Sequence, residues 1–193
     1  MTIILMTLLS ILTQLGLNQY SNQTDFKIDK KNQYSAILMN AIVWIVFVSK
    51  HEYSLNMLLV CLAFSILTST FFIDFKHQII PNEYVLGLLI LATVFIINNH
   101  KYWAVFVKGG LYFVLVFGIM FIVTKKLGFG DVKLSIPLGM FLGSGLVLNY
   151  LIVTFFTAVC GSILLLLLKK VKAKGNIAFG PYMVLGFFYL LLL

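Results

Sequence analysis

The residues most able to do chemistry in this sequence are two aspartates that flank long apolar runs. Asp74 follows a run that ends at Ile73, and Asp131 lies between the glycine-broken segment Gly128-Phe129-Gly130 and the next apolar run. An ionisable side chain at the edge of a membrane domain is costly to keep, so each is a candidate functional residue. The other four acids lie in polar segments or at the start of a run: Asp25, Asp29, Glu52 and Glu83. We therefore expect Asp74 and Asp131 to carry any chemistry.

Two carboxylates held close together are the minimum requirement for aspartyl proteolysis. Such a pair shares one proton, because both groups cannot ionise cheaply, which leaves one as a base toward water and the other as an acid. We expect Asp131 in the first turn of a helix, where the macrodipole favours a carboxylate, and Asp74 at a helix end, where it does not. These positions predict Asp131 as the base and Asp74 as the acid. Simpler alternatives stay open: Asp131 only caps a helix, and Asp74 pairs with Lys76 or is hydrated.

The composition is that of a polytopic membrane protein. Of 193 residues, 61% are hydrophobic and 10% are charged, whereas ordinary soluble proteins have about 25% charged residues. The net charge of +8 comes from lysines that lie in the gaps between apolar runs. Nucleic-acid binding is not expected, because it requires a basic patch or stripe.

Apolar runs predict an all-α polytopic transmembrane helical bundle of about eight spans (six to eight), in which the first two runs are marginal. The runs cover residues 3–17, 36–49, 53–73, 84–98, 102–124, 132–148, 150–168 and 177–193. Residues 134–168 carry no charge, yet as one helix they would reach about 52 Å, well beyond a hydrocarbon core of about 30 Å. We therefore expect a turn at Gly143-Ser144-Gly145 or at Asn149. The chain divides into residues 1–33, an apolar run with part of the polar connector Asn18 to Tyr34, and a membrane-embedded domain, 34–193.

Lysine counts predict the orientation in the membrane. If every run spans, eleven lysines fall on one side: Lys27, Lys30, Lys31, Lys76, Lys125, Lys126, Lys133, Lys169, Lys170, Lys172 and Lys174. Three fall on the other: Lys50, Lys101 and Lys108. The positive-inside rule places the first group in the cytoplasm, where basic residues also meet anionic lipid. Both aspartates then lie at cytoplasmic ends of a multi-pass protein of the cell membrane.

A family resemblance rests on the order of four short motifs. They are Ile73-Asp74, Ile80-Pro81-Asn82, Gly128-Phe129-Gly130-Asp131-Val132-Lys133 and Phe179-Gly180-Pro181-Tyr182. In this order the motifs resemble the type IV prepilin peptidases, which are membrane aspartyl proteases of the GxGD type. The likeness covers roughly residues 34–193.

The resemblance implies an endopeptidase that cuts the leader from prepilin or pseudopilin precursors, after a glycine, at the cytoplasmic face of the membrane. Such a protein would serve a pilus, secretion or competence system. The catalytic residues would be Asp74 and Asp131, with no metal ion and no cofactor. Substrate binding or structural support would come from the other motif residues: Gly128, Gly130, Lys133, Pro81, Asn82, Phe179, Gly180, Pro181 and Tyr182.

The sequence departs from the family in one respect. Many bacterial members carry a zinc-binding insert with two CxxC pairs, associated with N-methylation, whereas the segment from Asn18 to Tyr34 has no cysteine. Methyltransferase activity is therefore not expected. Cys61 and Cys160 lie singly in apolar runs and are expected to be small buried hydrophobes.

Two other functions remain as alternatives. A transporter or channel component would use Asp74 and Asp131 to relay protons or bind a cation. Transport folds often show internal repeats and broken helices at mid-membrane, and the sequence has neither a repeat nor an acid at mid-span. A catalytically silent assembly factor would retain the fold, but the intact acid pair disfavours it.

Overall fold

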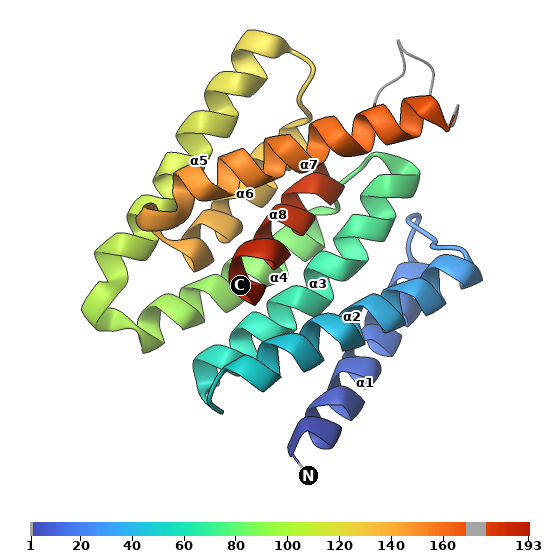
Figure 1. The fold of residues 1–193 in the computed structure, drawn as a ribbon, viewed down its shortest axis with the longest axis vertical. Coiled ribbons are helices and arrows are strands. Elements are labelled where there is room, and N and C mark those ends of the chain that lie inside the picture. The colour runs from blue at the N-terminus through green and yellow to red at the C-terminus, as the bar shows by residue number, and fades with distance from the viewer. Residues whose placement is uncertain (1, 169–176) are drawn as a thin grey trace.

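The computed structural model describes residues 2–168 and 177–193, and these residues form a bundle of α-helices (Figure 1). The helices are α1 (Thr2–Gln23), α2 (Lys30–Lys50), α3 (Leu55–His77), α4 (Asn82–Asn98), α5 (Trp103–Thr124), α6 (Phe129–Leu142), α7 (Val147–Leu167) and α8 (Gly180–Leu192). Short 3-10 turns precede α5 and α7. Each predicted apolar run therefore corresponds to one helix, with bounds that differ by a few residues, and the predicted all-α bundle is confirmed.

Helix α3 lies at the centre of the bundle and positions the first candidate acid. It packs against α1, α2, α4 and α8, and its side chains Phe64 and Leu67 are fully buried in the main core. The Ser54 hydroxyl caps its start by accepting from the Met57 N–H. The helix ends where Gln78 adopts a left-handed conformation and donates its N–H to the carbonyl of Asp74. Asp74 thus lies in the last turn, as predicted.

Helices α5 and α6 form a tight hairpin because glycines face each other across it. A Cβ at Gly139 would lie 2.6 Å from the carbonyl oxygen of Gly109, so the two backbones approach as closely as small residues permit. The hairpin ends at Gly143, whose φ of +72° breaks the helix. This confirms the predicted turn at Gly143, whereas Asn149 lies inside α7 and is no turn.

The polar segment from Asn18 to Tyr34 is mostly helical, which corrects the predicted connector. Only residues 24–29 are outside helices. The reason is that polar side chains bond between the helices: Asn18 Nδ2 in this segment donates to the Gln33 carbonyl of α2, and one turn earlier Gln14 Nε2 donates to Ser69 Oγ of α3 at 2.9 Å. Side-chain hydrogen bonds of this kind hold membrane helices together.

Among the described residues, five helices are long and apolar enough to cross a membrane: α1, α2, α3, α5 and α7, with the short 3-10 turns included for α5 and α7. Helices α4, α6 and α8 have 17, 14 and 13 residues. The chain is a multi-pass membrane protein. Cys61 is buried as predicted, but Cys160 is exposed, because it lies on the outward face of α7, few of whose residues are buried.

The ends of the helices form two opposite faces of the bundle. Both candidate acids lie at the face where Lys76 pairs with Asp29 at 2.8 Å. At the opposite face, Lys50 Nζ donates to the Leu192 carbonyl and the side chains of Asn56 and Asn99 bond to each other. Lys169, Lys170, Lys172 and Lys174, which the orientation count included, lie outside the described residues.

Candidate active site

Asp74 is held at the end of α3 beside the start of α8. Its side chain is only 4% exposed, and its Oδ2 has no hydrogen-bond partner among the described residues. The backbone N–H of Gly180 interacts with the carboxylate. A Cβ at Gly180 would lie 2.5 Å from Asp74 Oδ2, so this close approach requires a glycine.

Asp131 lies in the first turn of α6, as the sequence predicted. Its Oδ2 accepts the N–H of Gly128 at 3.1 Å, and its own N–H donates to the Gly128 carbonyl at 3.1 Å. The side chain is 6% exposed. Asp131 therefore does cap the helix, but a cap alone is normally hydrated, and the burial of this carboxylate indicates a further role.

Ile80, in the connection between α3 and α4, joins the surroundings of the two acids. A Cβ at Gly130 would lie 3.2 Å from Ile80 Cβ, and one at Gly180 would lie 3.2 Å from Ile80 Cδ1. The two carboxylates are close enough for a charge on one to disfavour a charge on the other. Ile80 belongs to one of the sequence motifs. Nothing in the sequence indicated that its side chain lies against both Gly130, beside Asp131, and Gly180, beside Asp74.

No cation neutralises the acid pair within the described residues. The proposed pairing of Asp74 with Lys76 is wrong, because Lys76 binds Asp29 and the carbonyl of Lys27 instead. Two buried carboxylates without a counter-charge among the described residues cannot both ionise cheaply, so the arrangement favours one ionised and one protonated acid. This is the electrostatic condition that general acid–base chemistry with water requires.

Asn82 and Lys133 tie together the two segments that carry the acids. Lys133 Nζ donates to Asn82 Oδ1 at 3.0 Å and lies 4.8 Å from the centre of the Phe129 ring. Pro81 is the extended residue that precedes α4, where its missing N–H costs no hydrogen bond. These residues therefore fix the α3–α4 connection against the start of α6.

The motif from Phe179 to Tyr182 forms the start of α8, but its members point in different directions. Gly180 faces Asp74, whereas the Tyr182 ring packs against Gly161 of α7, where a Cβ would collide with it. Phe179 packs against Phe117 and Phe155. Pro181 is buried in the first turn of α8. Within this motif, Gly180 is the residue that contacts a candidate acid.

Comparisons with known proteins show the family of this chain. The model of the type IV leader peptidase family matches residues 61–167, more than half of the chain, and the chain belongs to this family. A prepilin leader peptidase/N-methyltransferase of Legionella pneumophila is 30% identical over 147 residues, which are 69% of this chain and 49% of the relative. The chain thus spans about half the length of that curated relative. No solved structure matches the chain significantly.

Proposed function

We propose that the protein is a membrane aspartic endopeptidase that removes the leader peptide from type IV prepilin or pseudopilin precursors. The observation that carries the proposal is the pair of buried carboxylates, Asp74 and Asp131, at one end of the bundle, with no ion pair to either acid among the described residues. Membership of the leader peptidase family supports the choice of substrate. Membrane lipid surrounds the bundle, since the outward faces of its long helices are apolar.

The reaction follows from one shared proton. Asp131, as carboxylate, removes a proton from water, and the resulting oxygen nucleophile attacks the scissile carbonyl. Asp74, as carboxylic acid, gives its proton to the carbonyl oxygen, which forms a tetrahedral intermediate. The intermediate collapses, the C–N bond breaks, and the leaving nitrogen takes the proton held by Asp131. Asp74 takes back a proton from a hydroxyl of the intermediate as the C=O bond re-forms, so the pair is regenerated.

Contacts around each acid support these roles. Asp131 lies at a helix start and accepts a backbone N–H, which favours its ionised form. Asp74 lies at a helix end with one oxygen unpartnered among the described residues, which favours its protonated form. The Gly180 N–H beside Asp74 acts in the opposite direction, because it favours the ionised form of Asp74. A proton located on Asp131 with Asp74 bare, in a complex with a transition-state mimic, would reverse the assignment and leave the pair intact.

Processing of a precursor tests the function directly. The purified protein in lipid vesicles is expected to convert a full-length pilin-like precursor into a mature chain by cutting one peptide bond after a glycine. Because the cysteine-rich segment is absent from residues 18–34, we expect the new N-terminus to be a free amine, even when a methyl donor is supplied. Mass spectrometry of the product checks both points. An uncleaved precursor would overturn the proposed function, and a methylated product would reveal a methyl-transfer site.

We further propose that the acids face the cytoplasm, and single cysteines can test this orientation. Lys101 and Lys126 are exposed at opposite ends of α5, which is about 33 Å long. In a background with Cys61→Ala and Cys160→Ala, we expect an impermeant thiol reagent on intact cells to label Lys101→Cys. We expect Lys126→Cys to be labelled only after permeabilisation. Labelling at position 126 from outside would invert the orientation.

The transporter alternative has less support than the peptidase. A proton or cation path requires polar groups that continue through the membrane. Asp74 and Asp131 instead both lie at the same end of the bundle, and the matching family is one of peptidases.

A further inference from the structure

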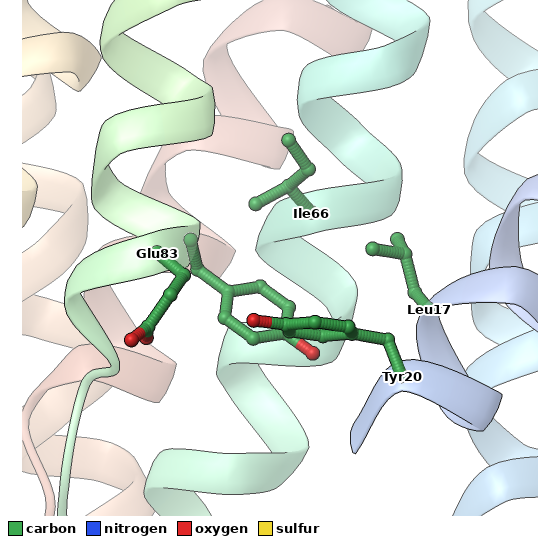
Figure 2. Close-up of a pocket in the computed structure, with 5 residues that line it drawn as sticks. Leu17, Tyr20, Ile66 and Glu83 are labelled. Atoms are coloured by element: carbon green, nitrogen blue, oxygen red, sulfur yellow. The ribbon is translucent and has the colours of Figure 1, made fainter. Parts of the chain in front are cut away.

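A pocket of about 200 Å³ opens between α1, α3 and α4 at the same end of the bundle as the acids (Figure 2). Its lining consists of Leu17 and Tyr20 from α1, Ile66 from α3, and Glu83 and Tyr84 from α4. Figure 2 shows the Tyr20 ring reaching across the pocket toward the start of α4, where Glu83 lies. This pocket contains neither candidate acid.

Two polar groups of the pocket, the Tyr84 hydroxyl and the Glu83 carboxylate, stand out by what they lack among the described residues. The Tyr84 side chain is only 5% exposed, and its hydroxyl has no hydrogen-bond partner among the described residues. A buried hydroxyl without a partner is costly, so this position favours a ligand that can bond to it. Glu83 is exposed and forms no ion pair within the described part of the chain.

These groups fit a cationic ligand. The Tyr20 and Tyr84 rings lie 6.2 Å apart between centres and are tilted by 58°. A carboxylate beside two tyrosine rings can accept the N–H donors of an ammonium group while the rings attract its charge. The site therefore suits a lysine-like or arginine-like side chain better than an anion.

An apolar groove of about 440 Å³ continues from the pocket along α3, between α1 and α4. Leu17 and Ile66 line both spaces. The groove follows α4 as far as Leu91, about 12 Å from Glu83 along the helix. Gly16 and Gly87 lie in its walls and leave room because they have no side chains. Pocket and groove together match a basic group followed by an apolar segment of about two helical turns.

The pocket also lies next to the candidate active site. Tyr84 packs with Ile73 in a small buried cluster, and Ile73 directly precedes Asp74 in the chain. Ile73 thus contacts a pocket residue and is also the chain neighbour of a candidate acid. A segment held in the groove would have its charged end at the end of the bundle where the acids lie.

From this placement we propose that the groove along α3, between α1 and α4, docks the apolar segment of the precursor, with a basic side chain of the precursor bound at Glu83. This inference rests on the proposed function and deepens it by locating the substrate. Two features favour a precursor over a lipid as the occupant. The Glu83 carboxylate suits a basic side chain and would repel a lipid phosphate, and the groove is continuous with the pocket that holds this carboxylate.

Photocrosslinking tests the docking separately from cleavage. The experiment uses the Asp131→Asn variant, which is expected to bind the precursor without cutting it. A photoreactive amino acid replaces either Ile90 in the groove or, as the control, Leu115 on α5. The two positions are similarly exposed, at 56% and 57%. We expect a covalent adduct with the co-expressed precursor from position 90 and none from position 115. Equal adducts from both positions, or only lipid adducts at position 90, would overturn the docking. Cleavage by the wild-type protein would still support the proposed function.

A charge exchange tests the pocket itself. Glu83→Lys is expected to lower the processing of a precursor with a lysine just before its apolar segment by about tenfold, because like charges would then meet. When that lysine of the precursor is replaced by glutamate, Glu83→Lys should process the precursor well and the wild type should process it poorly.

A second pair of variants tests the groove. Gly87→Phe fills the groove and should lower processing. Gly118→Phe lies on α5, where no atom is within 4 Å of an added Cβ, and should not. No effect of Glu83→Lys or of Gly87→Phe would contradict the proposal.

Discussion

Replacement of either candidate acid by asparagine is expected to lower precursor processing by about 10²–10⁴-fold, the usual contribution of general acid–base groups. Asparagine nearly preserves the shape of the side chain, but it can neither take a proton from water nor donate one to the carbonyl. Asp74→Asn and Asp131→Asn should each cost nearly as much as the double substitution, because the pair acts as a unit. The size shift of a co-expressed precursor measures the loss.

The control for this prediction is an acid outside the site. Asp25 is exposed and lies in the connection between α1 and α2, so Asp25→Asn should process the precursor at the wild-type rate. All three variants should accumulate in the membrane to similar levels, which separates lost chemistry from lost folding. Full processing by Asp74→Asn or by Asp131→Asn would remove that residue from the site.

The sequence predicted the elements of the fold well, because hydrophobic runs report directly on membrane helices. It placed one helix in each run, the turn at Gly143 and both acids at helix ends. The prediction failed where polar residues bond to a partner helix. Asn18 is buried inside the structure and donates to the carbonyl of Gln33 on α2, and a rule that ends a span where polar residues begin cannot anticipate a partner on another helix.

The sequence predicted the candidate site only in part. The order of the motifs indicated which residues matter, but not that Ile80 touches the surroundings of both acids or that Gly180 contacts Asp74. The pocket at Glu83 and Tyr84 left no pattern in the sequence at all. Its walls come from three helices, so only the packing of these helices brings the partnerless hydroxyl and the carboxylate together.

Gly180→Ala is expected to lower processing by about 100-fold, the loss that a displacement of about 1 Å in a catalytic group can cause. The new Cβ would lie 2.5 Å from Asp74 Oδ2, so the carboxylate must shift or α8 must move away from it. Gly180 is the first residue of α8, and its φ lies outside the left-handed range, so alanine should strain the contact with Asp74 rather than the backbone. Processing rate and membrane accumulation, measured together, check this expectation.

A series of glycine-to-alanine variants separates the contact with Asp74 from a general effect of the substitution. Gly130→Ala would place a Cβ 3.2 Å from Ile80, which can give slightly, so we expect a smaller loss than at Gly180. Gly118→Ala on α5 meets no atom within 4 Å and should leave processing unchanged. The predicted order of loss is therefore Gly180, then Gly130, then Gly118. Processing at the wild-type rate by Gly180→Ala would contradict this prediction. It would show that the close contact between Gly180 and Asp74 is not needed for the reaction.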